Sequence, residues 1–447
     1  MRKHILFIVL FVATAAFATK SVSLEQLQQD GWEAYKGQRI KLTTPLIVCG
    51  RFGDSITLST ERLYVPEERA VGLAEGDSTR YWELVNYNRL HSIKLVCKTP
   101  FWLNLGSMVR NLEAYVVGER SLQTGQQPKF KNYTPSKKLP DLGKHDLLVC
   151  AANIQNYFVH LGGYASKRTT PKQHALQRLK VASALTYFDA DLYAICEIEK
   201  GTAAPTDLVA AMNEIKRSDV YDFVHTSGTD GDTISVGFIY RKDKIKPYGE
   251  LRSAFQAPSI YAYRFMLQGF EDLNTGERFI ISLNHPRSKR GTPQYSNQKR
   301  MANIEAILGN IHQAYEDKVY EDPDILMLGD YNCYRYEEPN QTIVKAGYED
   351  MLASDSLNYS YSYKGECGSL DRVFATPTMA AQISGVAHIH WNTDYYYSAA
   401  YYSKYNFNDK PYDAKQNNIK KVMTKAAKKN LLFRYSDHDP VLIGIKF

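Results

Sequence analysis

The sequence predicts a mixed α/β (α+β) protein, in which a layered α/β sandwich follows a smaller domain built of strands. Two observations carry this prediction. Short segments with the alternating pattern of β-strands dominate residues 37–117. After residue 144, longer and continuously apolar strands are interspersed with helical segments. Continuously apolar strands are typical of sheets buried on both faces, and their mixture with helices is typical of layered α/β folds.

The first 18 residues have the pattern of a secretory signal peptide. Arg2 and Lys3 form a positive head, and residues 5–16 are an apolar run too short to span a bilayer. Small residues precede the expected cleavage after Ala18. No later stretch is long and apolar enough for a membrane helix. We therefore expect an exported protein, periplasmic or extracellular, without stable membrane association.

Residues 19–118 are expected to form a small β-barrel domain. Residues 20–34 carry apolar side chains at roughly helical spacing, which predicts a short helix. Strands are expected at residues 39–42, 55–58, 93–96 and 112–117. Several short strands suggest a barrel, for which an OB-like (oligonucleotide/oligosaccharide-binding) barrel is one candidate and a ligand-free stabilising cap the alternative. Residues 119–144 are polar and rich in turn formers, and are expected to be a linker.

Residues 145–447 are expected to form the larger, layered domain. It begins with a buried strand at residues 147–152, followed by a helix over residues 172–188. Further strands are expected at residues 192–198, 235–240, 278–284, 325–329, 369–375 and 440–445. Further helices are expected at residues 297–315 and 417–429.

Bulk composition restricts the function only weakly. The net charge of +7 at pH 7 is compatible with a polyanionic partner, but solubility alone explains such an excess equally well. Six cysteines in an exported chain permit disulfides, and the absence of a Cys-x-x-Cys pair argues against a structural zinc site. Their spacing favours two disulfides and two buried thiols: Cys49 with Cys97, Cys333 with Cys367, and Cys150 and Cys196 on neighbouring strands.

Acids, amides and histidines recur at the ends of the strands of the larger domain. Six strands carry such residues at or near one of their ends: Asn153 with Gln155, Glu197 with Glu199, Asn284 with His285, Asp330 with Asn332, Asp371 within its strand, and Asp437 with His438 and Asp439 before theirs. Residues i and i+2 of a strand face the same way, so three of these pairs can aim two groups at one site. Carboxylate and amide oxygens suit Mg²⁺, Mn²⁺ or Ca²⁺, and histidine supplies a proton donor or acceptor. The set predicts phosphoryl-transfer chemistry.

Each element has a plainer interpretation when it is taken alone. An Asp-x-Asn after a strand is usually a turn former or a helix cap, and a Ser-Asp-His stretch is often a polar loop. Glu197 and Glu199 also suit the solvent-facing side of an edge strand. Six such groups at successive strand ends of one domain are nevertheless hard to assign to chance.

With these residues in place, the chain from about residue 147 to 447 resembles the endonuclease/exonuclease/phosphatase superfamily. Asn153 and Glu197 lie in stretches similar to the family's opening Asn motif and its metal-binding Glu motif. Residues 329–332 are similar to its Gly-Asp-x-Asn signature, and residues 436–440 to its closing Ser-Asp-His motif. The resemblance implies a four-layer α/β sandwich of the deoxyribonuclease type.

The resemblance also implies a metal site. Glu197 is expected to hold a divalent cation, helped by Asn153 and Asp437. The oxygen ligands make Mg²⁺ the first expectation, with Mn²⁺ or Ca²⁺ as alternatives.

The remaining motif residues are expected to be catalytic. By the resemblance, Asp330 and Asn332 orient the attacking water and bind the phosphate. His438, supported by Asp371, is the acid/base member of the set. His285 donates to a phosphate oxygen and stabilises the pentacovalent transition state.

A closer resemblance is to bacterial extracellular nucleases, which often carry an N-terminal barrel domain. Residues 284–291 are similar to their Asn-His-x-Lys-Ser-Lys-Gly stretch, with Arg287 in place of the first lysine. Asn284, Arg287 and Lys289 are therefore expected to bind the substrate phosphate. Arg434, which precedes the Ser-Asp-His motif, is expected to contact substrate as well.

These features favour an exported metal-dependent nuclease, acting as a monomer on DNA more than on RNA, with no protein partner. Tyrosines in residues 395–405 and lysines in residues 420–429 are a candidate nucleic-acid surface, although packing and solvation explain them as well. A phospholipid or phosphosugar phosphodiesterase is the alternative enzyme, but a lipid enzyme needs an exposed apolar loop that is not obvious here. A non-catalytic binding protein is disfavoured because every matched position is filled.

Overall fold

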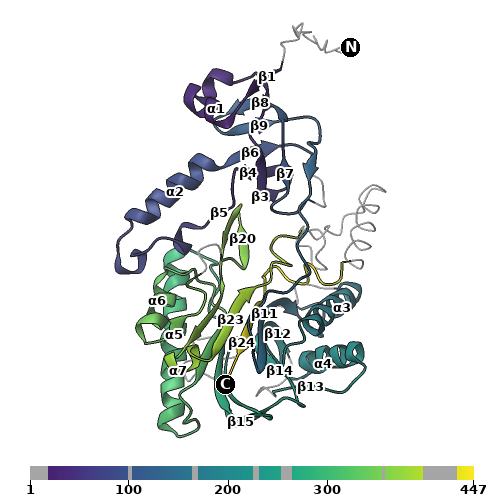
Figure 1. Ribbon diagram of the computed structural model, residues 1–447, viewed down its shortest axis with the longest axis vertical. Coiled ribbons are helices and arrows are strands. Elements are labelled where there is room, and N and C mark those ends of the chain that lie inside the picture. The colour runs from purple at the N-terminus through teal and green to yellow at the C-terminus, as the bar shows by residue number, and fades with distance from the viewer. Residues whose placement is uncertain are drawn as a thin grey trace, which may run out of the picture.

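The structure is a computed structural model that describes residues 19–98, 103–163, 170–224, 231–252, 264–354, 358–395 and 430–447 (Figure 1). The expected signal peptide, the tyrosines beyond residue 395 and the expected helix at residues 417–429 lie outside these ranges. Within them, no helix is both long and apolar enough to cross a membrane.

Two six-stranded sheets form the centre of the larger domain, as far as the described residues show. The first has the order β13 (Tyr221–Phe223), β14 (Gly231–Arg241), β12 (Leu192–Lys200), β11 (Leu147–Tyr157), β24 (Val441–Ile445), β23 (Ile383–His388). The second has the order β15 (Ile245–Arg252), β16 (Phe265–Asp272), β17 (Arg278–Asn284), β18 (Ile325–Asp330), β22 (Asp371–Ala375), β19 (Glu349–Asp350). Apolar side chains of both sheets, such as Val149 and Leu283, are fully buried in one shared cluster.

Helices cover the outer face of each sheet. Helices α3 (Pro171–Phe188) and α4 (Ala203–Lys216) lie on one side, and α5 (Pro293–Glu316) and α6 (Glu338–Lys345) on the other, with the sheets between them (Figure 1). This arrangement confirms the predicted four-layer α/β sandwich, called the sandwich below. The sequence marks the start of one of these outer helices. Helix α3 begins at a capping box of Thr170 and Gln173, and Pro171 lies in its first turn.

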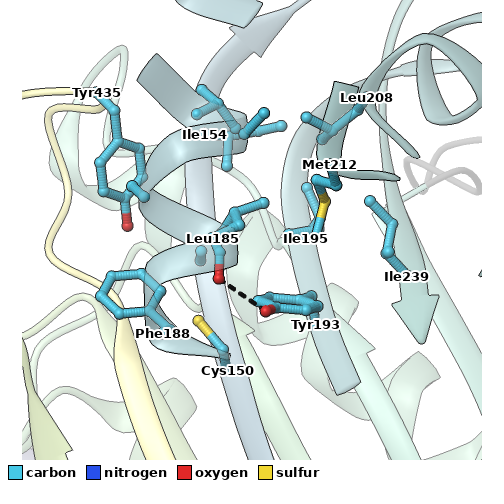
Figure 2. Packing of buried hydrophobic residues seen from close by; sticks show 14 of the residues in the cluster. Cys150, Ile154, Leu185, Phe188, Tyr193, Ile195, Leu208, Met212, Ile239 and Tyr435 are labelled. Atoms are coloured by element: carbon cyan, nitrogen blue, oxygen red, sulfur yellow. Dashed lines mark hydrogen bonds between the residues drawn. The ribbon is translucent and has the colours of Figure 1, made fainter. Parts of the chain in front are cut away.

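The cluster beneath α3 and α4 shows how tightly these layers pack (Figure 2). Leu185 and Phe188 of α3 pack beside Cys150 of β11, and Met212 of α4 packs beside strand β12. The hydroxyl of the buried Tyr193 donates to the Leu185 carbonyl oxygen at 2.7 Å. The sheet and the helix are thus joined by apolar contacts and by a buried hydroxyl whose hydrogen bond is satisfied.

A nine-stranded sheet forms the N-terminal region, residues 19–131, among the residues the structure describes. Its order is β1 (Lys20–Val22), β2 (Arg39–Leu42), β8 (Leu112–Gly118), β9 (Ser121–Gln123), β6 (Ile93–Val96), β4 (Ser55–Ser59), β3 (Leu46–Phe52), β7 (Met108–Val109), β10 (Phe130–Lys131). The four predicted strands and the short helix α1 (Leu24–Asp30) are present. Closure of this sheet into an OB-like barrel stays a prediction.

Two features of the N-terminal region differ from expectation. The sheet continues past the expected boundary at residue 118, because β9 and β10 lie inside the expected linker and pair with β6, β8 and β7. Helix α2 (Thr79–His91) lies within residues 37–117, where the sequence indicated short strands and no helix. Only Asn88 of this helix is buried, so it carries no apolar stripe of helical period that would reveal it in the sequence.

The cysteine expectation is corrected in part. All six cysteines are free and buried, so the two expected disulfides are wrong. Cys49 instead donates its thiol to the Glu61 carbonyl oxygen at 3.3 Å. Cys150 and Cys196 do lie buried on the neighbouring strands β11 and β12, as predicted.

A small sheet joins the N-terminal region to the sandwich. Strand β5 (Leu63–Tyr64) pairs in parallel with β21 (Glu366–Gly368), which pairs with β20 (Tyr361–Tyr363). Buried charges reinforce this junction: Arg372 of β22 forms ion pairs with Asp350 and, at 2.9 Å, with Glu68 of the N-terminal region.

Replacing Arg372 with methionine is expected to lower the free energy of unfolding by about 3–5 kcal/mol, because the buried Glu68 loses its cation and Asp350 keeps only Arg335, at 3.7 Å. Urea denaturation followed by circular dichroism measures the change. Arg39→Met is the control, since Arg39 pairs with Glu113 at 2.8 Å on the surface and such pairs contribute little. Equal stability of the two variants would contradict the prediction.

Candidate active site

The topology brings the polar strand ends to one edge of the two sheets. Strands β11 and β12 run parallel, and so do β17 and β18, so their carboxyl ends lie at the same edge of each sheet. Strand β22 runs antiparallel to β18, which places its first residue, Asp371, directly opposite Asp330. Strand β24 runs antiparallel to β11, so the residues that precede it, including His438, reach the same edge.

His438 and Asp371 form a buried hydrogen-bonded pair. Nδ1 of His438 lies 2.7 Å from Oδ2 of Asp371. Burial alone would lower the pKa of His438, but the carboxylates of Asp371 and Asp330 raise this pKa well above its usual value. We therefore expect a protonated imidazole whose Nε2 lies 3.9 Å from Oδ2 of Asp330.

Asp330 lies at the centre of the cluster. Its Oδ2 accepts from Nδ2 of Asn153 at 3.0 Å and lies 3.6 Å from Nε2 of His285. Its Oδ1 accepts from the backbone N–H of Asn332 at 2.8 Å. Burial raises the pKa of Asp330, an effect that the nearby His438 opposes. Such a carboxyl group is suited to exchange a proton near neutral pH.

His285 differs from His438 in its protonation. Burial and the charges of Arg264 and His438 hold the pKa of His285 well below its usual value, so its imidazole is neutral. Among the described residues, its Nδ1 has no hydrogen-bond partner, whereas its Nε2 lies near the Asp330 and Glu197 carboxylates. This environment favours a proton on Nε2, the atom that faces the cluster.

Unusual backbone conformations accompany the site. Gly329 has a φ of 128°, and a Cβ at this position would lie 2.1 Å from the Asn284 carbonyl oxygen. Glu197 (φ 65°) and Asn332 (φ 51°) also adopt positive φ angles, which cost energy for residues with a side chain. The glycine of the Gly-Asp-x-Asn signature is thus required by the close approach of β17 to β18.

Glu197 and Asp437 supply the acids of the expected metal site. The pKa of Glu197 is raised by burial and next by the nearby Asp437. Oε2 of Glu197 accepts from the backbone N–H of Asn156 at 2.9 Å. Oδ1 of the third expected ligand, Asn153, accepts from the backbone N–H of Gln155 at 2.9 Å, which fixes the orientation of its amide.

The donor set fits a hard divalent cation. In the parts of the chain that the structure describes, no group of three or more His, Cys, Asp or Glu residues is arranged to hold a metal. Two crowded carboxylates and an amide oxygen are nevertheless ligands that Mg²⁺, Mn²⁺ and Ca²⁺ prefer, and a cation would offset the repulsion between Glu197 and Asp437. Mg²⁺ also commonly keeps several of its waters, so few protein ligands suffice.

Two of the expected substrate-binding residues are engaged elsewhere. Nζ of Lys289 lies 2.6 Å from Oε1 of Glu337, so its charge is already paired. The amide of Asn284 is fully buried and donates to the Ser282 carbonyl oxygen and the Tyr331 hydroxyl. Their assignment as phosphate ligands stays a prediction, and the sequence did not reveal these partners.

The other two expected substrate-binding residues are partly or fully buried. Nη1 of Arg434 donates to the Asn392 carbonyl oxygen at 2.5 Å, which ties the loop before His438 to the sandwich. The backbone N–H of Arg287 donates to Asn303 of α5 at 3.1 Å. Their contact with substrate stays a prediction.

Tyr361 and Arg264 belong to the site, although the sequence did not single them out. The ring of Tyr361, on β20, lies 4.8 Å from the His438 ring. The charge of Arg264 lowers the pKa of both His285 and Glu197, and its carbonyl oxygen accepts from the His285 backbone N–H at 2.8 Å. Arg264 directly precedes β16, so recognition of that strand in the sequence would have pointed to it.

Several solved structures match about two thirds of this chain. An endonuclease/exonuclease/phosphatase family protein from Bacteroides thetaiotaomicron is 16% identical, with a TM-score of 0.41, and the match covers 66% of this chain and 96% of that chain. A mannosyl-6-phosphatase from the same organism has 16% identity, a TM-score of 0.41 and coverages of 67% and 100%. The human Nocturnin catalytic domain with bound sulfate has 12% identity, a TM-score of 0.41 and coverages of 67% and 93%.

Comparison with curated proteins gives no match. A family model does match the sequence: residues 162–446 match that of the Endonuclease/Exonuclease/phosphatase family. The matched segment is more than half of the chain and spans most of the sandwich. The chain therefore belongs to the endonuclease/exonuclease/phosphatase family, a family of phosphoester hydrolases.

Proposed function

We propose that this protein is a divalent-metal-dependent phosphodiesterase that hydrolyses nucleic acid, DNA more than RNA, as an exported monomer. The observation that carries the proposal is the buried cluster in which both His438 and His285 direct Nε2 toward Asp330. Nearby carboxylates raise the pKa of His438 and burial lowers that of His285, so we expect the cluster to offer a proton donor, a neutral hydrogen-bond donor and a carboxylate within one small volume.

These groups match the needs of an in-line attack on phosphorus. Asp330 accepts a proton from the attacking water, because its raised pKa makes it a usable base near neutral pH. His438 enters the reaction protonated and donates toward the negative charge that develops on an oxygen of the phosphate. His285 donates from Nε2 to a second phosphate oxygen.

The metal ligands and the proton-transfer groups occupy adjacent positions. A divalent cation held by Glu197, Asp437 and Asn153 would neutralise charge on the phosphate. Oε1 of Glu197 lies 4.0 Å from Nε2 of His285, so a phosphate bound at this point contacts both parts of the site.

The choice of nucleic acid as substrate is supported by sequence. Residues 284–291 are similar to a stretch of bacterial extracellular nucleases, and the net charge of +7 is compatible with a polyanionic partner. Export is supported by the pattern of the first 18 residues.

Plasmid nicking tests the proposed reaction. The purified protein without its first 18 residues is expected to convert supercoiled DNA to nicked circles with Mg²⁺, Mn²⁺ or Ca²⁺, and to lose this activity in EDTA. RNA is tested in parallel. Survival of DNA and RNA with every metal would reject the nuclease assignment.

Glu197→Gln is expected to raise the metal concentration that gives half-maximal activity by at least about tenfold, because a carboxylate ligand is lost. The titration uses the same nicking assay. Glu199→Gln is the matched control: this buried acid lies two residues further along β12 and binds His160 at 2.6 Å, outside the proposed metal site. Identical metal dependence of both variants would refute the assignment of Glu197.

A further inference from the structure

One short segment of the N-terminal region, residues 62–68, contacts the sandwich on both sides of the His438–Asp371 pair. We propose that Arg62 and Glu68 are positioning residues for this pair, so that the N-terminal region completes the active site rather than only adding a second domain. The inference rests on the proposed function, because it concerns the geometry of the same catalytic pair.

Glu68 contacts the chain on each side of Asp371. Oε1 of the buried Glu68 accepts from Nη1 of Arg372 at 2.9 Å. Its Oε2 accepts from the backbone N–H of Ser369 at 3.2 Å. The Ser369 hydroxyl in turn donates to the Asp371 carbonyl oxygen at 2.8 Å. A carboxylate from the N-terminal region thus holds the segment that presents Asp371 to His438.

The contacts from Glu68 to the Asp371 segment form the first connection between the N-terminal region and the catalytic pair. A second connection begins at Arg62. Its guanidinium forms an ion pair with the fully buried Asp394 at 2.9 Å and lies 4.6 Å from the centre of the Tyr359 ring. The Tyr359 hydroxyl donates to the same Asp394 carboxylate at 2.8 Å. Removal of the arginine would leave a buried carboxylate without its cation, so Asp394 and Tyr359 depend on Arg62 for their arrangement.

This second connection reaches the residue after His438. Tyr359 stacks on His390 with ring centres 3.9 Å apart, and His390 Nδ1 lies 3.0 Å from Oδ2 of Asp439. Oδ1 of Asp439 accepts from the backbone N–H of Asn392 at 2.8 Å. The position of Asp439, and with it that of His438, is therefore set by a stack that ends at Arg62.

Ser360 joins the two connections. Its hydroxyl oxygen accepts from the backbone N–H groups of Leu370 and Asp371 at 3.0 and 3.1 Å. Its carbonyl oxygen accepts from the backbone N–H of Asp439 at 2.8 Å. Ser360 follows Tyr359 directly, so a shift of the Tyr359 stack would move both members of the pair relative to one another.

The alternative is that residues 62–68 stabilise the junction of the two regions without affecting the catalytic geometry. The two roles predict different results, because a misplacement of about 1 Å far from the reacting atoms can cost about 100-fold in rate while the protein stays folded. A stabilising role alone would lower the melting temperature and leave the rate of the folded molecules unchanged.

Steady-state kinetics on bis(4-nitrophenyl) phosphate test the proposal, since this small diester occupies the catalytic centre alone. Arg62→Met and Glu68→Gln of the full mature chain are each expected to lower kcat about 10- to 100-fold with little change in KM. Arg62→Lys keeps the charge beside Asp394 and is expected to recover most of the loss. All rates are measured at a temperature where circular dichroism shows each variant folded.

Glu75→Gln is the matched control. Glu75 also belongs to the N-terminal region and pairs with Lys345 of α6 at 3.0 Å, but both side chains are exposed and neither contacts the two connections. Its kcat is expected to equal that of the wild type. Unchanged kcat in folded Arg62→Met and Glu68→Gln would overturn the proposal, as would equal losses in the control.

Proton NMR separates failure of this inference from failure of the proposed function. The proton between His438 Nδ1 and Asp371 gives a downfield signal, identified by its loss in His438→Ala. We expect this signal to shift or broaden in Glu68→Gln and to stay unchanged in Glu75→Gln. An inactive wild type would reject the proposed function, whereas an active wild type with unchanged signal and rates in both variants would reject only the positioning role.

Discussion

Asp330→Asn is expected to lower kcat for phosphodiester hydrolysis by about 10²- to 10⁴-fold, the range associated with loss of a general base. The substitution keeps the shape of the side chain but removes the group that accepts the proton of water. It also turns the hydrogen-bond acceptor for Asn153 into a possible donor and removes the charge that lies 3.6 Å from Nε2 of His285, which breaks the centre of the cluster. Rates on plasmid DNA and on the small diester measure the effect.

Asp272→Asn is the control for this prediction. Asp272 is a buried acid of β16 in the same sheet as Asp330, but its Oδ1 accepts from the turn residues Asn274 and Thr275. This control is expected to lose some stability and to keep its kcat. An Asp330→Asn variant within tenfold of the wild-type rate would show that Asp330 is not the base.

The sandwich was predictable because its central strands are buried on both faces. The first six residues of β11 and the first four of β18 are continuously apolar, and this pattern is visible in the sequence without knowledge of their neighbours. Helix α2 was not predictable in the same way, because it buries only Asn88 and lacks an apolar stripe. Prediction from the sequence succeeds where burial gives a segment a continuous or periodic run of apolar residues. It fails where an element lies on the surface.

The same distinction applies to the site. Asp330 and Asn332 could be singled out because they lie in the Gly-Asp-x-Asn signature at a strand end, which is a local property, although the turn that places Asn332 beyond β18 with a φ of 51° was not visible in the sequence. The ion pair of Lys289 with Glu337 was not predictable, because Glu337 is distant in the sequence and no local pattern links the two. Tyr361 was missed for a similar reason: its place beside His438 depends on the pairing of β20 with β21.

The contacts of residues 62–68 are the extreme case. Glu68 and Arg372 are separated by 304 residues, and Arg62 and Asp394 by 332. Each of the four is an ordinary charged residue when it is considered alone. Only the folded chain shows that they lie buried as pairs beside the His438–Asp371 segments.

The His438–Asp371 pair is expected to act as one catalytic unit, so that the effects of its substitutions are not additive. His438→Ala should lower kcat about 10²- to 10⁴-fold, because the protonated donor is lost. Asp371→Asn should cost nearly as much, because the 2.7 Å contact that holds the ring and raises the pKa of His438 is broken. Once His438 is absent, Asp371 has no proton donor to support.

A double-mutant cycle on the small diester measures this coupling. The double variant is expected to have nearly the activity of His438→Ala alone, whereas independent residues would multiply their effects. Asn153→Ala combined with His438→Ala is the comparison, because Asn153 contacts Asp330 and the proposed metal rather than His438. Multiplied losses in the Asp371/His438 cycle would show that the carboxylate acts independently of the histidine, and the assignment of His438 as a donor supported by Asp371 would then be wrong.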